Sequence, residues 1–170
     1  MNSIDVLVET FGRVREHVHG TVEGLDEKAL NLQVDAEANP IGWLVWHLTR
    51  VQDDHVAELA GTEQAYTADG WADRFGFDLP PSSIGYGHTP AQVAAVHVTD
   101  PALLTGYYDA VHDRTLAYLR TLADADLDEV IDDRWDPPVT RGVRLVSVAD
   151  DDIQHAGQAA YVAGIARRGS

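Results

Sequence analysis

The chain has 170 residues, of which 28 are acidic and 12 are basic, so its formal charge at neutral pH is −16. A surface this acidic repels phosphate groups, and we therefore expect neither a nucleic-acid partner nor binding to a membrane surface. Cysteine is absent. This excludes disulfides, thiolate metal ligands and a cysteine nucleophile, so any thiol in the chemistry must come from another molecule.

The length suits one compact domain, and we treat residues 1–170 as a single domain. No stretch approaches the roughly 18 apolar residues needed to cross a bilayer. The N-terminal segment contains Asp5 and Glu9, whereas a secretion signal would have basic residues followed by an apolar run. These features predict a cytoplasmic protein.

Two long helices are predicted in the first third of the chain. The first covers about residues 2–23, because its apolar positions recur at intervals of three and four residues, and Asn2 or Ser3 can cap it. The second covers about residues 39–61, since Asn39-Pro40 supplies a cap residue followed by a proline at the first helical position. A glycine follows or ends each of these two segments.

The rest of the chain predicts two more long helices and two irregular connections. Residues 61–90 are rich in Gly, Pro and aromatic residues and have no helical period, which is typical of a long functional loop. A short helix over about residues 90–97 and a long one over about residues 99–122 follow. Pro137-Pro138 then interrupts any helix before the last one, at about residues 145–167. Few segments alternate as strands do, so we predict an all-α four-helix bundle whose consecutive helices are not always neighbours.

Three polar residues lie on the apolar faces of two predicted helices. His47 lies on the stripe of Leu44 and Val51, and Asp151 and His155 are one turn apart on the last helix. His47 suits a neutral core histidine, and Asp151 and His155 suit an ion pair or a solvent-facing edge. Alternatively, these three side chains hold a divalent cation, because two imidazoles and a carboxylate on facing helices suit Zn²⁺, Ni²⁺ or Fe²⁺ and leave positions open. The spacing alone leaves these alternatives open.

The segments NPIGWLVWHLTRVQDDHV and DDIQHAGQAAYVAG resemble the second and last helices of the DinB-like superfamily, the latter with its His-x-Gly-Gln signature. The resemblance covers nearly the whole chain. It implies a DinB-like four-helix bundle in which His47, Asp151 and His155 bind the metal. Asp151 stands where the family usually has Glu or His. Because aspartate is one methylene shorter, either the metal shifts, Asp152 replaces Asp151, or the affinity falls.

The run QDDH and the loop IGYGHTPAQVAAVHV resemble most closely the actinobacterial members thought to be mycothiol S-transferases, which are related to the metal-binding domain of mycothiol-dependent maleylpyruvate isomerase. This resemblance implies a thiol S-transferase that activates mycothiol or a similar low-molecular-weight thiol as a metal-bound thiolate, which then attacks an electrophilic small molecule. A thiol has a pKa of about 8.5 in water, and coordination to a divalent cation deprotonates it. We expect Zn²⁺, with Ni²⁺ or Fe²⁺ as alternatives, and a homodimer like many relatives.

Three further residues are candidates for catalysis. Gln158 lies one turn beyond His155 and is expected to orient a ligand or substrate. Asp54 and His55 lie two turns beyond His47 on the same predicted helix, where they would line the pocket, support the ligands or act as a base.

Three others are candidates for binding the thiol co-substrate. Arg141 and Arg144 precede the last helix and would meet a carboxylate of the thiol, or else form ordinary surface pairs with Asp132 or Asp133. His88 lies in a glycine-rich loop, where it would contact substrate or serve only in a turn.

Two other functions are compatible with the same residues. A metal-dependent hydrolase would activate water in place of sulfur and would need no thiol. A non-enzymatic stress or ligand-binding protein would keep the fold without the metal, and the aspartate at position 151 is the feature that favours this alternative.

Overall fold

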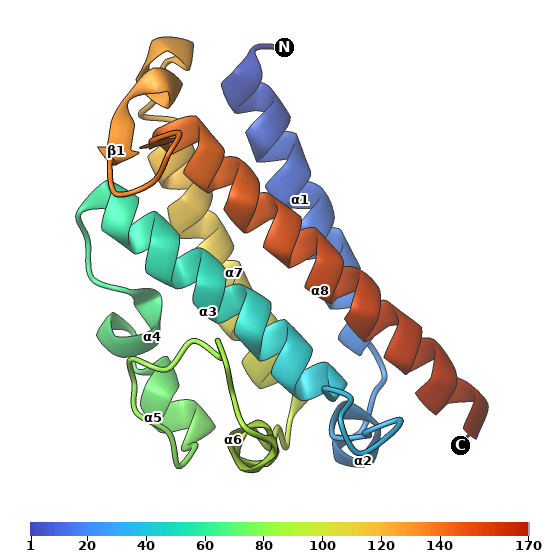
Figure 1. Ribbon diagram of the computed structural model, residues 1–170. Coiled ribbons are helices and arrows are strands. Elements are labelled where there is room, and N and C mark those ends of the chain that lie inside the picture. The colour runs from blue at the N-terminus through green and yellow to red at the C-terminus, as the bar shows by residue number, and fades with distance from the viewer. Residues whose placement is uncertain (170) are drawn as a thin grey trace.

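Four long helices form the body of the protein in the computed structural model, which describes residues 1–169 (Figure 1). They are α1 (Ser3–Val22), α3 (Ile41–Ala60), α7 (Pro101–Leu119) and α8 (Arg141–Gly169). Helix α3 packs most closely on α8 and also on α7, and α1 packs on the same two helices. Helices that follow one another along the chain, α1 and α3 or α7 and α8, therefore occupy opposite corners of the bundle. The predicted all-α bundle is confirmed.

The bundle is held together by the apolar faces of these helices. Helix α1 buries residues at intervals of three and four, as its sequence predicts, and Phe11 at its centre is fully buried. Helix α3 is buried along nearly its whole length, because it contacts the short helices as well as α7 and α8. Removal of these side chains from water is the main force that stabilises the bundle. The largest fully buried side chains include Phe11, Trp46, Arg50, Tyr107, Tyr108 and Leu145.

The helix ends agree with the sequence except at two places. Asn2 caps α1 in a capping box with Asp5, and Asp100 caps α7. The prediction that Asn39 caps α3 is wrong, because Pro40 occupies the cap position and no side chain bonds the first turn. The last helix also begins four residues earlier than predicted, at Arg141, directly after a short strand.

The connections contain more regular structure than the sequence indicates. The helices α2 (Glu27–Leu30), α4 (Ala65–Ala68) and α5 (Trp71–Phe75) were not predicted, because four or five residues are too few to show a period, whereas α6 (Pro90–Ala95) was. A 3-10 turn, η1 (Asp124–Asp128), precedes an antiparallel pair of strands, β1 (Val130–Asp132) and β2 (Val139–Thr140). This hairpin lies against the start of α8 (Figure 1).

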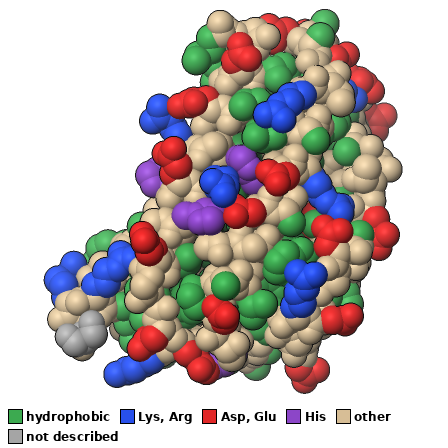
Figure 2. Space-filling view, turned by 180° about the vertical axis from the view of Figure 1, so that it is seen from behind, with side chains coloured by type: hydrophobic (Ala, Val, Ile, Leu, Met, Phe, Trp, Pro, Cys, Tyr) green, Lys and Arg blue, Asp and Glu red, His purple; other side chains and the backbone are tan. Residues whose placement is uncertain are grey.

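The surface carries both signs of charge. On the face opposite to that of Figure 1, basic side chains are scattered among acidic ones, with hydrophobic side chains exposed between them (Figure 2). Within residues 1–169, none of the helices has the length and apolar character that a membrane span requires.

Candidate metal centre

The triad of His47, Asp151 and His155 lies where α3 and α8 pack together. One ligand atom from each of the three side chains lies within 4.8 Å of the other two. His47 is 3% exposed. The side chains of His155 and Asp151 are 19% and 20% exposed, and their Nε2 and Oδ1 atoms are 3.7 Å apart. The cluster thus has a fully buried side on α3 and a largely buried side on α8.

The surroundings of His47 fix its protonation state. Its Nδ1 donates a hydrogen bond to the backbone carbonyl of Ile84, so its Nε2 atom keeps a free lone pair. The ring of Trp43 stacks on the imidazole with centroids 4.5 Å apart. Burial lowers the pKa of His47, which keeps the ring neutral, and a metal ligand must be neutral.

His155 is oriented in the same way by a different acceptor. Its Nδ1 faces Oε1 of Gln158 at 2.8 Å, and a proton on Nδ1 that donates to this oxygen leaves Nε2 free toward Asp151. Histidines that bind metals in proteins are usually held at their second nitrogen by a carbonyl or carboxylate. Both histidines of the triad meet this requirement.

The third member of the triad, Asp151, has a buried oxygen without a protein partner. Its Oδ2 atom is inaccessible to solvent and bonds no group among residues 1–169. A buried carboxylate oxygen left unpaired is costly, and a cation would satisfy it. Imidazole nitrogen and carboxylate oxygen are both common ligands of Zn²⁺. The donor set therefore fits a divalent cation.

Asp152 does not take part in this cluster. Its side chain points into the bundle, is fully buried, and has no hydrogen-bond partner within residues 1–169 for either oxygen. Burial, followed by the charge of Asp151, raises its pKa well above the usual range, which disfavours the charged form of this carboxyl group. Of the two adjacent aspartates, Asp151 is the one that the fold brings to the histidines.

A buried arginine holds the loop that reaches His47. Arg50 is fully buried on α3, where its guanidinium donates to the backbone carbonyls of Pro81 at 3.0 Å and Ser83 at 3.1 Å. Its charge is balanced by Asp53, 3.5 Å away. The carbonyl of Ile84, which fixes His47, directly follows this anchored segment. Arg50 was not predicted from the sequence, although its charge within the mainly apolar stretch WLVWHLTRV was a usable signal.

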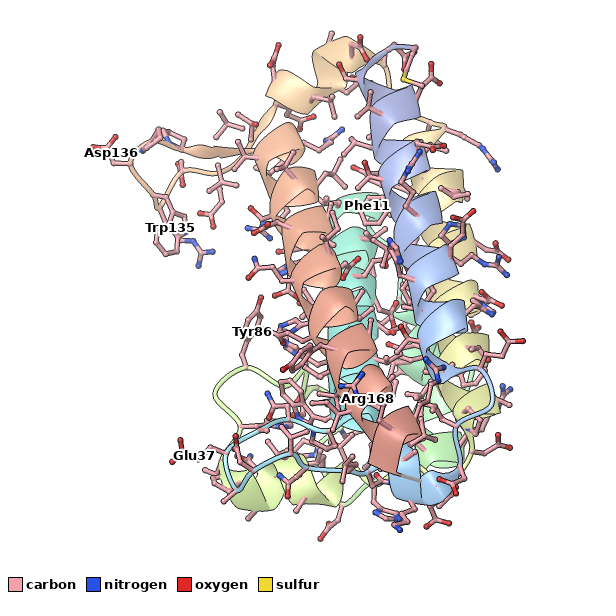
Figure 3. All side chains as sticks on the ribbon, turned by 90° about the vertical axis from the view of Figure 1, so that its right-hand side faces the viewer. Phe11, Glu37, Tyr86, Trp135, Asp136 and Arg168 are labelled. Atoms are coloured by element: carbon pink, nitrogen blue, oxygen red, sulfur yellow. The ribbon has the colours of Figure 1, made fainter. Side chains whose placement is uncertain are left out.

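Tyr86 was also missed, and it stands over the triad from the loop between α5 and α6. Its ring centroid is 5.4 Å from that of His47, yet the residue is 61% exposed. It projects beside α8, on the same side of the molecule as Trp135 of the hairpin (Figure 3). Partial burial, and then the charges of Asp151 and Asp54, raise the pKa of Tyr86. A neutral hydroxyl is therefore present at the mouth of the site.

The predicted catalytic residues on α3 contact other partners. Asp54 accepts a hydrogen bond from Nε2 of Gln64 at 2.6 Å. His55 faces Arg144, with 3.3 Å between the ring Nδ1 and the guanidinium, and burial together with this positive charge lowers the pKa of His55. Gln158, by contrast, lies in the position expected of it, in contact with His155.

The two arginines proposed for the thiol are held by carboxylates. Arg141 pairs with Glu129 at 2.6 Å. Arg144 pairs with Glu58 at 3.1 Å and lies 3.8 Å from Asp132. The contact with Asp132 is the surface ion pair that the sequence analysis gave as the alternative to thiol binding.

His88 is engaged at both ring nitrogens. Its Nδ1 accepts from the indole of Trp43 at 3.1 Å and its Nε2 faces the hydroxyl of Ser83 at 2.8 Å. This bonding gives His88 a structural place between the loop and the tryptophan that covers His47.

Comparisons with known proteins agree with this architecture. Residues 10–159 match the family model of the DinB superfamily. The chain is similar to the crystal structure of a conserved protein from Enterococcus faecalis, with 33% sequence identity, a TM-score of 0.90 and 96% of each chain covered. No curated protein shows significant sequence similarity to the chain.

Proposed function

The chain belongs to the DinB superfamily, whose members often bind metals, and on this premise we propose that it is a metal-dependent thiol S-transferase. His47, Asp151 and His155 would hold one divalent cation, with Zn²⁺ as the expected ion. The observation that carries the proposal is the orientation of the two histidines. Each has its Nδ1 bound to a carbonyl oxygen, which leaves its Nε2 free, and a ligand atom of each lies within 4.8 Å of an oxygen of Asp151.

The thiol is external, because the chain has no cysteine. When bound, a divalent cation would lower the pKa of a coordinated thiol so that the thiolate forms at neutral pH. The transfer forms a bond between sulfur and an electrophilic carbon, while the leaving group departs with its electron pair and the thiol proton passes to solvent. Mycothiol, or a thiol of similar size, is the co-substrate we propose.

The protein's own side chains would position these reactants. Trp43 and the loop around Ile84 cover one side of His47 and exclude water from it. Tyr86 contacts His47 from the same loop, is exposed, and would present its neutral hydroxyl to a bound molecule. His55 lies two turns after His47 on α3, and Arg144 lies two turns before Asp151 on α8. An acidic group of the thiol would have to compete with Glu58 for the guanidinium of Arg144.

The first test is the metal content of the untagged protein, measured by mass spectrometry. We expect about one divalent ion per chain, its loss in His155→Ala, and its retention in His97→Ala, which removes an exposed histidine paired with Glu27. A protein that takes up no ion even after incubation with Zn²⁺, Ni²⁺ and Fe²⁺ would contradict the proposal and favour a non-enzymatic role.

The second test separates sulfur transfer from hydrolysis. Conjugation of monobromobimane, an uncharged thiol-reactive electrophile, is followed with and without mycothiol in the metal-loaded protein. A transferase requires the thiol, and His155→Ala must abolish the enzymatic rate. Turnover of ester or amide substrates without any thiol would instead identify a hydrolase. The predicted homodimer is tested on the same samples by light scattering.

A further inference from the structure

An open cavity of about 420 Å³ lies beside the triad, between the segment that precedes α3 and the second half of α8. Gln158 joins the cavity to the triad, because it lines the cavity while its Oε1 atom bonds Nδ1 of His155 at 2.8 Å. Leu44, another lining residue, lies one turn before His47 on α3. A molecule in this cavity would therefore contact Gln158, the side chain that separates the cavity from His155.

Every side chain that lines this cavity is uncharged, in a protein with a formal charge of −16. Leu44 and Val162 provide apolar surface, whereas Asn39, Gln158 and Tyr161 provide polar groups. Because Oε1 of Gln158 faces His155, the amide Nε2 is the atom left to bond a ligand. The lining therefore offers no counter-charge to a charged ligand.

Gly157 has no packing reason to be a glycine. It lies in the interior of α8, where a Cβ would meet no atom within 4 Å. Glycine there destabilises a helix by about 1 kcal/mol relative to alanine, and no close neighbour demands its small size. Gly157 is also a lining residue of the cavity. Its missing side chain leaves the wall of the cavity open.

The other end of the groove between α3 and α8 differs in charge. There Arg144 pairs with Glu58 and faces His55, and Arg134 pairs with Asp132. The triad thus separates an uncharged end from a charged end, which suits two reactants of different polarity meeting at the metal.

We propose that the cavity binds an uncharged small molecule that combines an apolar ring or chain with a hydrogen-bond acceptor, such as a carbonyl oxygen. Its acceptor bonds the amide of Gln158, and its apolar part lies against Leu44, Gly157 and Val162. The role of this molecule rests on the proposed function, in which it is the electrophile that receives the thiol.

The test uses benzamide as an uncharged probe of this kind and isosteric benzamidine as its charged counterpart. Binding to the full-length, Zn²⁺-treated protein is followed by ¹H–¹⁵N NMR at the backbone amide of Gly157 and the side-chain amide of Gln158. Gly157→Leu fills the cavity, and Gly12→Leu is the matched control, because Gly12 lies within α1 and a Cβ there also meets no atom within 4 Å.

We expect saturable benzamide shifts at both amides, at least tenfold weaker binding in Gly157→Leu, unchanged binding in Gly12→Leu, and at least tenfold weaker binding of benzamidine. Absence of saturable shifts, or equal binding by both variants or by both probes, would overturn the inference. The metal content of the same samples separates the two proposals. Benzamide binding without bound Zn²⁺ would contradict the metal site alone, whereas bound Zn²⁺ without benzamide binding would contradict the cavity alone.

Discussion

Gly85 lies directly against the imidazole of His47, so closely that a Cβ at position 85 would overlap Nδ1 and stand 3.0 Å from Cγ. The backbone at Gly85 has a φ of +101°, a conformation that side chains other than glycine rarely adopt. The carbonyl of the preceding residue, Ile84, accepts the hydrogen bond from the same imidazole. The close approach of the loop to His47 and the fixed orientation of this histidine therefore depend on the same backbone segment.

We expect Gly85→Ala to weaken Zn²⁺ binding at least tenfold, because the new methyl group must displace either His47 or the carbonyl that orients it. Gly87→Ala is the control, since Gly87 also has a positive φ but a Cβ there meets no atom within 4 Å. Both variants also carry backbone strain, which is about 1–2 kcal/mol for the left-handed conformation at Gly87 and at least as large at Gly85, whose φ is +101°. Isothermal titration with Zn²⁺ and a thermal melt distinguish the effects, and equal affinities in the two variants would show that contact with His47 is unimportant.

Gln158→Leu removes the acceptor that holds Nδ1 of His155. Loss of such a supporting hydrogen bond lowers metal affinity about 10–100-fold, and we expect a decrease in this range, measured by competition with a chromophoric chelator. Gln154→Leu is the matched control, because Gln154 is exposed on the same helix and bonds Asp150. If both variants bind Zn²⁺ as tightly as the original protein, His155 is oriented by other means.

Arg50→Met tests the arginine that anchors the loop. The substitution leaves Asp53 buried without its cation and frees the carbonyls of Pro81 and Ser83, so we expect a loss of about 3–5 kcal/mol in the free energy of unfolding. Arg13 forms an ion pair on the surface with a side chain that is 70% exposed, so Arg13→Met should change the free energy of unfolding by less than about 0.5 kcal/mol.

Urea denaturation measures the free energy of unfolding of both arginine variants, and amide hydrogen exchange measures the protection of the loop at residues 81–88. Arg50→Lys keeps the positive charge but lacks the forked guanidinium, so its loss in the free energy of unfolding should lie between those of Arg50→Met and Arg13→Met. Unchanged exchange protection at residues 81–88 in Arg50→Met would contradict the anchoring role.

The buried His112 makes the stability of the fold depend on pH. Neither ring nitrogen has a hydrogen-bond partner within residues 1–169, the nearest carboxylate being Asp113 at 3.8 Å. Burial, and then the charge of Arg15, lower the pKa of His112. Below a pH of about 6.5 the unfolded chain therefore binds a proton that the folded protein takes up only at lower pH. The free energy of unfolding must fall as the pH decreases through this range.

His112→Leu should remove this contribution. The variant should be at least as stable as the original protein at pH 7.5, because leucine replaces two buried ring nitrogens that have no hydrogen-bond partner. It should also lose less stability on transfer to pH 5.5. Urea denaturation at the two pH values measures the difference. An equal loss of stability in both proteins would mean that His112 does not titrate in this range.

The long helices could be predicted because their signals are local. A period of three to four residues, a cap such as Asp100 and a following glycine such as Gly61 act within a few residues of the helix that they define. The cap of α3 and the start of α8 were misplaced for the opposite reason. The start of α3 depends on packing, and the start of α8 depends on the strand β2 that directly precedes it. Neither can be read from the residues next to the helix boundary.

The sequence by itself predicted the bundle and, through the spacing on α8 and the resemblance of two segments, a candidate site of His47, His155 and one of two adjacent aspartates. Only the tertiary structure decided that Asp151 turns toward His47 while Asp152 points into the core. It also brought Ile84 and Tyr86, nearly forty residues further along the chain, onto His47. Contacts between segments far apart in sequence depend on how whole helices pack, and no local pattern of residues records that geometry.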